Sequence, residues 1–291
     1  MIRIWNLIGI LALATVMLSC KGDKERTAAQ MEFMSTGAGT VELGAQKAKV
    51  VRMYEQPAPM KNQPEQILRR KGYTVSYNSR TRNPNWVAWH LTKAHTFGSY
   101  QRKQEVFTED IEVTPRATDY DYYNSRYDRG HMCPAGDNKW SQEAMTESFL
   151  FTNVCPQNHG LNKYEWNDLE ILCRDWAREY GAIDIVCGPI YGKSGDQKTI
   201  GRNKVWVPAA FFKVILCRKG APKAIGFIYR NEGVKQTREE AVHSVDEIEA
   251  LTGIDFFPAL DDDVEKVEWQ ANHIKRHTGH FWHNARSLTI V

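Results

Sequence analysis

Arg129, Gly130 and His131 are the residues of this 291-residue chain whose types and spacing most directly suggest chemistry. A neutral imidazole is the side chain best suited to take a proton from water near pH 7. A guanidinium offers a fixed fork of donors to phosphate oxygens, and glycine lets another group approach the backbone closely. The group predicts hydrolysis at a phosphate centre, with His131 as general base and Arg129 offsetting negative charge. The alternative for His131 is a satisfied histidine on a strand.

Two polar residues further along the chain could complete such a site. Asn162 offers one neutral oxygen, which suits Mg²⁺ because this ion keeps most of its hydration shell. Glu170 follows eight positions later, two helical turns on, and so would point from roughly the same face. The alternatives are a helix cap for Asn162 and a solvated carboxylate for Glu170.

The chain resembles the family of DNA/RNA non-specific endonucleases in four motifs that occur in the same order. These motifs are Asp128-Arg129-Gly130-His131, Asn153 with Pro156-Gln157, Leu161-Asn162 with Trp166 and Leu169-Glu170, and Gly188-Pro189-Ile190 with Val207-Pro208 and Phe211 to Val214. The resemblance covers roughly residues 67–260. It implies a ββα-metal motif within a sheet-rich domain, and Mg²⁺-dependent hydrolysis of DNA and RNA that leaves 5′-phosphates, with Mn²⁺ as a substitute ion.

The resemblance also implies individual roles. His131 matches the general base, Asn162 the magnesium ligand, and Glu170 a carboxylate that orients metal-bound waters. Asn153 matches an asparagine that helps to hold the site together. Arg102 lies near a second arginine that acts at the transition state, although the alignment is loose there and a surface charge is the alternative.

The elements that must position these residues can be read from the sequence pattern. Strands are predicted at residues 73–77, 86–91, 183–187, 211–217 and 224–229, and helices at 141–149, 166–180 and 244–252. Ser141 and Ser244 are good N-caps, Glu247 completes a capping box, and Gly181 ends the second helix. The pattern predicts an α+β fold with a mixed, mainly antiparallel sheet and packed helices, and the resemblance adds the ββα-metal nuclease motif.

Four segments are predicted along the chain: a signal peptide of the lipoprotein type (1–20), a flexible tether (21–64), the non-specific endonuclease domain (65–262) and a His-rich C-terminal extension (263–291). The apolar run after Arg3 is too short for a comfortable membrane span, and Leu18-Ser19-Cys20 resembles a lipobox. We therefore expect export from a bacterial cytoplasm, followed by lipid anchoring at Cys20 or by secretion. Five further cysteines leave an odd number, and their pairing stays open.

The placement of charged residues along the chain says more about function than the net charge does. The net charge of +3 is too small to indicate nucleic-acid binding. Nine basic residues and one acid lie between Lys61 and Lys103, and the balance reverses between Gln104 and Tyr123. This pattern fits either two solvated faces or a phosphate-facing surface beside a metal site, and by itself it favours the solvated faces.

Two other functions stay open at this point. One is a surface lipoprotein that binds nucleic acid without cutting it, which would use the basic stretch but not His131, Asn162 and Glu170 together. The other is a metal carrier built on the C-terminal His273, His277, His280 and His283. Because the spacing lacks the glutamate of an HExxH motif, we favour a basic or structural tail.

Overall fold

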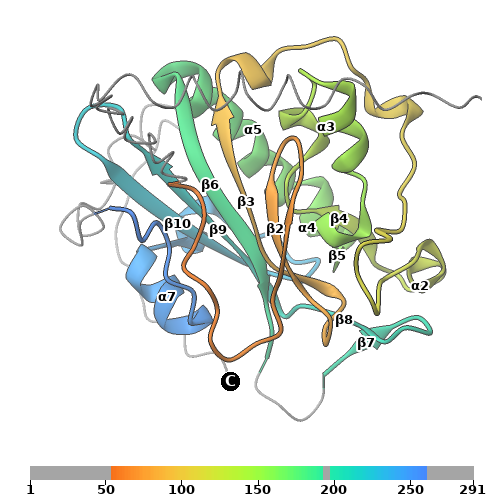
Figure 1. The fold of residues 1–291 in the computed structure, drawn as a ribbon. Helices are drawn as coiled ribbons and strands as arrows, with labels where there is room; N and C mark the ends of the chain where they lie inside the picture. The colour runs from red at the N-terminus through yellow and green to blue at the C-terminus, as the bar shows by residue number, and fades with distance from the viewer. Residues whose placement is uncertain (1–53, 193–196, 261–291) are drawn as a thin grey trace, which may run out of the picture. The chain divides into compact units, whose positions relative to one another are not determined.

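A seven-stranded antiparallel sheet forms the centre of the domain in the computed structural model, which describes residues 54–192 and 197–260 (Figure 1). Its strand order is β1-β2-β3-β6-β9-β10-β11. The strands are β1 (Gln66–Arg69), β2 (Thr74–Asn78), β3 (Asn83–Thr92), β6 (Ala182–Ile190), β9 (Ala210–Cys217), β10 (Lys223–Arg230) and β11 (Val242–His243). The predicted signal peptide with Cys20 and the His-rich extension lie outside the described residues.

Helices and two small hairpins surround this sheet. The α-helices are α2 (Asp119–Tyr122), α3 (Gln142–Glu147), α4 (His159–Lys163), α5 (Glu165–Tyr180), α6 (Arg238–Ala241) and α7 (Val245–Thr252). The hairpins pair β4 (Asp128–His131) with β5 (Val154–Gln157), and β7 (Thr199–Ile200) with β8 (Val205–Trp206). Short 3-10 turns are η1 (Ala94–Thr96), η2 (Arg102–Gln104), η3 (Ala135–Asp137) and η4 (Phe151–Asn153).

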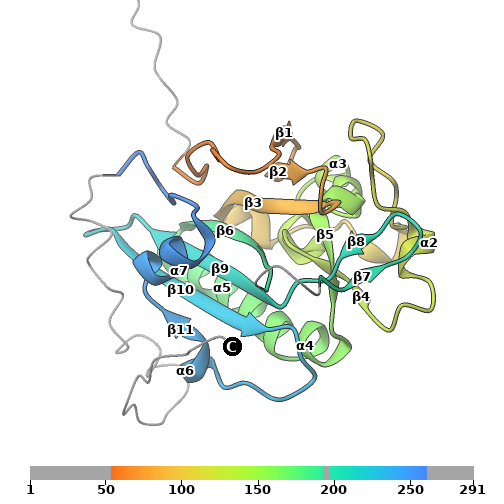
Figure 2. The same cartoon turned by 90° about the horizontal axis from the view of Figure 1, so that it is seen from below.

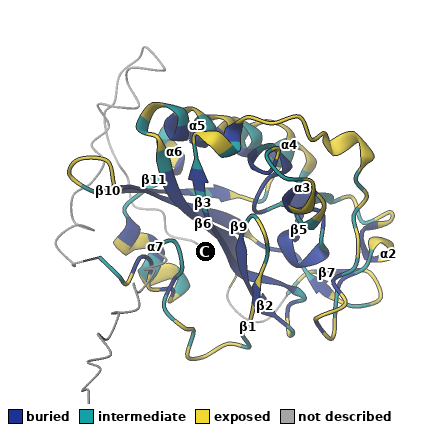
Figure 3. Ribbon diagram, turned by 45° about the horizontal axis from the view of Figure 1, so that its top comes forward, coloured by how far each residue is buried: buried dark blue, intermediate teal, exposed yellow. Residues whose placement is uncertain are grey.

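Both faces of the sheet are buried, by different helices. Figure 2 shows α5 and α7 on opposite sides of strands β6, β9 and β10, and Figure 3 shows those strands as buried. Side chains alternate between the faces of a strand. Phe211 and Ile215 of β9 therefore join the core beneath α5, whereas Phe212 and Val214 join the core beneath α7.

The β4–β5 hairpin and α4–α5 form the ββα arrangement that the sequence predicted. His131 pairs with Val154 and Gly130 with Cys155 across the hairpin. A side chain at Gly130 would overlap that of Gln157, so the close approach predicted there requires glycine. The predicted α+β fold class is confirmed by the antiparallel sheet and its helices.

The predicted helix ends are confirmed as well. Ser141 accepts a hydrogen bond from Ala144 N, and Ser244 forms a capping box with Glu247. Gly181 follows α5 with a φ of 92°, which favours glycine. Before β1, Ala58 N donates to Asp255 O and Met60 packs against the core beneath α7. These contacts show that residues near the end of the predicted tether pack on the domain.

Candidate active site

His131 ends β4 with its imidazole enclosed by aromatic rings. The Phe107 and Phe149 rings lie 5.1 and 4.9 Å from it between centroids. Burial, with a smaller contribution from the nearby Arg102 charge, lowers the pKa of His131 to about 3. Its Nε2 is buried and has no hydrogen-bond partner among the described residues. The imidazole is therefore neutral at pH 7 and has a free nitrogen that can accept a proton.

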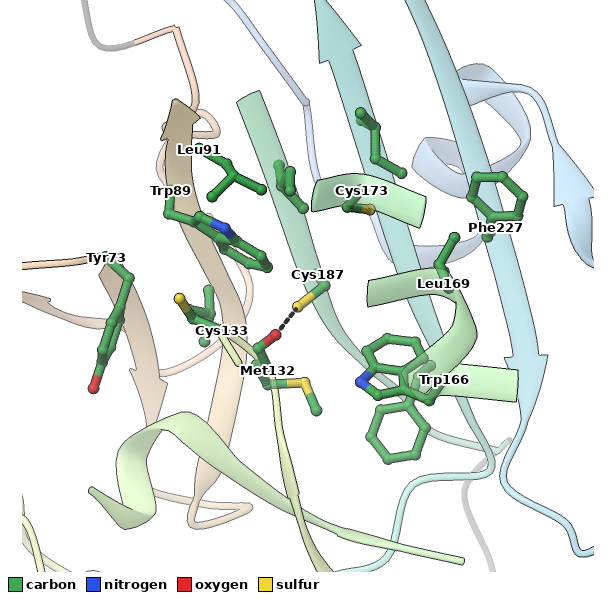
Figure 4. Packing of buried hydrophobic residues seen from close by; sticks show 14 of the residues in the cluster. Tyr73, Trp89, Leu91, Met132, Cys133, Trp166, Leu169, Cys173, Cys187 and Phe227 are labelled. Atoms are coloured by element: carbon green, nitrogen blue, oxygen red, sulfur yellow. Dashed lines mark hydrogen bonds between the residues drawn. The ribbon is translucent and has the colours of Figure 1, made fainter. Parts of the chain in front are cut away.

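The backbone around His131 is held from the core. Trp166 Nε1 donates to His131 O at 3.2 Å, and Cys187 Sγ donates to Met132 O at 3.3 Å (Figure 4). Asn153 is fully buried: its Oδ1 accepts from Cys133 N, and its Nδ2 donates to the carbonyls of Cys133 and Ser148. Asn153 is thus placed to fix the end of β4 rather than to touch a substrate.

Asn162 lies on α4 beside the first residue of β4. Its Nδ2 donates to Asp128 Oδ2 at 2.9 Å, and His159 Nδ1 contacts the same oxygen at 3.0 Å. The first hydrogen bond orients the amide and leaves Asn162 Oδ1 as the available ligand. The neutral amide oxygen of the half-buried Asn162 is the type of ligand that suits a hydrated Mg²⁺. No group of three or more His, Cys, Asp or Glu residues within 54–192 and 197–260 could hold a metal.

Asn162 and Glu170 do not lie on one continuous helix, as their spacing of eight residues had suggested. Tyr164, with φ −113° and ψ −87°, separates α4 from α5. Asn162 does not cap a helix either, because the N-cap of α4 is Asn158, whose side chain accepts from Gly160 N. The position of Asn162 relative to Glu170 therefore depends on how the two helices pack.

Glu170 is half-buried on α5, and its carboxyl is surrounded by charges. Burial raises its pKa to about 7, against the opposing effects of Lys213, Arg174 and Arg102, while Asp137 adds to the rise. A carboxyl that titrates near neutrality can exchange protons with water at working pH.

The two predicted arginines lie on separate elements. Arg129 of β4 is paired with Asp119, the first residue of α2, at 2.6 Å. Arg102 is exposed on η2, with its guanidinium carbon 6.0 Å from the centroid of the Phe149 ring, which in turn contacts His131 edge-on. Both arginines therefore have contacts that place them near the imidazole or its strand.

The acidic stretch between Gln104 and Tyr123 is used for internal pairing. Asp110 binds Arg70 and Thr152, Asp121 accepts from Asn203, and Glu109 pairs with Arg116. Together with Asp119, these acids fold a loop rather than gather at one point.

Sequence reasoning missed two cations, one partly and one fully buried. Arg174 of α5 pairs with the buried Asp137 at 2.9 Å and is placed one turn beyond Glu170. Lys213 is fully buried on β9. The i+4 spacing from Glu170 is a signal that could have identified Arg174, and a lysine inside an apolar strand is one that could have identified Lys213.

The five described cysteines, Cys133, Cys155, Cys173, Cys187 and Cys217, are all free and buried. Burial raises the pKa of Cys173 and of Cys187 to about 12, so these thiols stay protonated and weakly reactive.

No helix among the described residues is long and apolar enough to cross a membrane.

Comparison with known proteins agrees with this geometry. The family model of the DNA/RNA non-specific endonucleases matches residues 53–263. Among similar proteins, the mitochondrial nuclease EXOG of Xenopus laevis is 37% identical over 66% of this chain and 58% of its own length. Human mitochondrial endonuclease G is 33% identical over 67% of this chain and 70% of its own length. The matched segment thus spans less than two thirds of the EXOG proteins.

A solved structure is similar as well. The crystal structure of the EndoG/EndoGI complex aligns with a TM-score of 0.66 and 28% identity, covering 72% of this chain and 90% of that one. The mitochondrial nuclease of Saccharomyces cerevisiae is 33% identical over 69% of this chain and 68% of its own length.

One prediction from the sequence is wrong. The N-terminal pattern led us to expect export from a bacterial cytoplasm, whereas the named relatives are mitochondrial nucleases rather than bacterial lipoproteins. A short apolar run after a positive charge is a targeting pattern without a folded structure to test it, so it discriminates poorly between destinations.

Proposed function

Because this chain belongs to the DNA/RNA non-specific endonuclease family, we propose that it is a Mg²⁺-dependent nuclease that hydrolyses phosphodiester bonds in both DNA and RNA. Mn²⁺ is the expected substitute ion. The observation that carries the proposal is the neutral His131, whose buried Nε2 has no hydrogen-bond partner among residues 54–192 and 197–260. Such a nitrogen is suited to accept a proton from an attacking water.

The reaction can be written from the side chains around the hairpin. His131 Nε2 takes the proton of a water that attacks the phosphorus, and the bond to the 3′ oxygen breaks on the opposite side. That oxygen takes a proton from solvent water, and His131 returns its own proton to solvent. Arg129 donates to the phosphate oxygens and offsets their growing charge. Asn162 Oδ1 would hold a hydrated Mg²⁺, which supplies positive charge at the phosphate when bound.

The remaining predicted residues support these groups. Asn153 fixes the backbone that follows His131, through three hydrogen bonds to Cys133 and Ser148. Glu170, with a pKa near 7, is suited to orient waters around the ion, and Arg102 adds positive charge beside His131. Recognition through phosphates rather than base edges gives little sequence preference.

A nicking assay tests the proposal. Supercoiled plasmid and a structured RNA are incubated with the protein in Mg²⁺, in Mn²⁺ and in EDTA. We expect both substrates to be cut with either ion and neither in EDTA. His131→Ala should lose cleavage by about a thousandfold or more while binding persists, as expected when a general base is removed.

His243→Ala is the matched control, because His243 pairs with Glu247 at the other end of the sheet order from β1. It should cut at the wild-type rate. Binding of both nucleic acids by the wild-type protein without cleavage would instead support a non-catalytic binding protein. Equal rates for His131→Ala and wild type would remove the assignment of the base.

A further inference from the structure

Lys213 is a lysine in the interior of the domain, on strand β9, which lies between β6 and β10 in the large sheet. Its side chain is fully buried, and its Nζ has no hydrogen-bond partner among the described residues. Lys213 pairs in register with Cys187 of β6 and Phe227 of β10. Because side chains alternate along a strand and Phe211 and Ile215 face α5, Lys213 faces α5 too.

Two indole rings enclose the Lys213 ammonium. Its Nζ lies 4.3 Å from the Trp166 ring centroid and 5.4 Å from that of Trp89. A cation over an indole face is attracted by the ring quadrupole, more strongly where water is excluded. Figure 4 shows the Trp89 indole above Met132 and the Trp166 indole to its right, and Met132 directly follows His131, the last residue of β4.

Both indoles connect onward to the candidate active site. Trp166 Nε1 donates to His131 O at 3.2 Å. Trp89 Nε1 donates to Asp137 Oδ2 at 3.0 Å, and Asp137 Oδ1 accepts from Arg174. A single ammonium therefore contacts the ring that supports the His131 backbone and the ring that supports the Asp137–Arg174 pair.

Two cations and two acids lie around the Trp166 and Trp89 rings. Trp166, Glu170 and Arg174 are spaced by four residues on α5, so they share one helix face, and Lys213 contacts the first of them. Lys213 and Arg174 are the cations, and Glu170 and Asp137 the acids. An isolated buried ion is strongly unfavourable, whereas paired ions can persist.

The pKa values of Lys213 and Glu170 reflect these neighbouring charges. Burial alone lowers the pKa of Lys213, but Cys187, Glu170, Cys173 and Asp137 oppose that effect and leave the pKa raised. Of these four groups only the two carboxyls can carry charge at neutral pH, because the two thiols stay protonated there. Lys213 is therefore charged at neutral pH. Among the charges that lower the pKa of Glu170 against the effect of burial, Lys213 is the largest, followed by Arg174 and Arg102.

We propose that Lys213 is a positioning residue of the nuclease site: its buried ammonium fixes the Trp166 ring that supports the backbone of His131 and supplies positive charge to the side of the site that holds Glu170. The expected effect of Lys213 on cleavage rests on the proposed function. Its charge and its effect on Glu170 do not depend on that function. We expect a neutral side chain of similar shape to change the pH dependence of the site, which loss of packing alone would not do.

Lys213→Met is the test variant, because methionine keeps a long apolar stem and removes the charge. The Glu170 carboxyl is titrated by ¹³C NMR in metal-free protein, and plasmid nicking is measured from pH 5 to 9. We expect the Glu170 midpoint and the acidic limb of the nicking rate to move up together by about one to three pH units, as loss of a neighbouring opposite charge requires. At pH 7 the rate should fall about fivefold for a shift of one unit and more for a larger one.

Lys219→Met is the matched control. It removes an exposed lysine six residues along from Lys213, in the turn that follows β9. It should move neither midpoint. If Lys213→Met lost activity equally at every pH while Glu170 titrated as in the wild type, Lys213 would serve packing alone and the proposal would be overturned.

A measurement on the wild-type protein keeps the test decisive if Lys213→Met does not fold. The charge state of Lys213 is read from its ¹⁵Nζ and ¹³Cε shifts, and we expect a protonated amine up to at least about pH 9. A neutral Lys213 at pH 7 would overturn the inference. If the wild-type protein cut no nucleic acid, the proposed function would fail, while both NMR titrations would still report on Lys213 and Glu170.

Discussion

Arg129 and Asp119 form an ion pair in which the guanidinium closes on a carboxylate of its own chain. Arg129 Nη2 and Nε lie 2.6 and 2.7 Å from Asp119 Oδ1, and Nη2 also reaches the Asp119 carbonyl at 3.4 Å. Asp119 is 60% exposed, so the pair can open toward solvent. A phosphate that uses the Nε–Nη2 edge of Arg129 must therefore displace Asp119 first.

Asp119→Asn should lower the KM for nucleic acid about threefold to tenfold and leave kcat nearly unchanged, because it removes a competitor from the ground state only. Steady-state nicking at low salt measures this. Asp175→Asn, which breaks the exposed pair with Arg178 on α5, is the control and should leave KM unchanged. A higher KM for Asp119→Asn would show that Asp119 orders Arg129 for binding instead.

The rate of cleavage should rise as the pH climbs through about 7, because the Glu170 carboxyl loses its proton there. His131 contributes no limb in this range, since its pKa of about 3 keeps it neutral throughout. A pH–rate profile of the wild-type protein tests this expectation. A profile that is flat from pH 5 to 9 would contradict the role given to Glu170.

Glu170 also predicts how stability depends on pH. Its pKa in the folded protein is raised from the ordinary 4.5, so the folded state keeps a proton that the unfolded chain has lost. The contribution of Glu170 to stability is therefore present at low pH and is lost as the pH rises through about 7. Glu170→Gln should raise the Tm more at pH 8 than at pH 5, and an equal change at both values would argue against a buried carboxyl.

Asn162→Ala should require a higher Mg²⁺ concentration for half-maximal cleavage, because it removes the protein oxygen proposed to hold the ion. Calorimetry should show Mg²⁺ and Mn²⁺ binding weakened at least tenfold. Asn167→Ala, which changes a half-buried residue of α5, is the control. An unchanged metal titration in Asn162→Ala would count against that ligand.

Asn153→Ala should lower the free energy of unfolding by about 2 to 5 kcal/mol, because it leaves the buried backbone groups of Cys133 and Ser148 without partners. Urea unfolding followed by fluorescence measures the change. Asn162→Ala should cost far less stability because Asn162 is only half-buried. Equal stability losses in the two variants would contradict the division of labour between them.

The sequence by itself determined the local elements and the order of the motifs. Alternating strands, the Ser141 and Ser244 caps and the stop at Gly181 depend on neighbouring residues, whose preferences are written into short windows of sequence. The Arg129-Gly130-His131 run was readable for the same reason, because its chemistry and its spacing are local.

Tertiary structure decided the environment of each group. The Phe107 and Phe149 rings that desolvate His131, the Asp119 that occupies Arg129, and the Lys213 ammonium beside Glu170 all come from distant segments. The break at Tyr164 likewise replaced a single helix face by the packing of two helices. Burial and charge act through space, so the pKa values that set the chemistry follow from the fold and not from residue order.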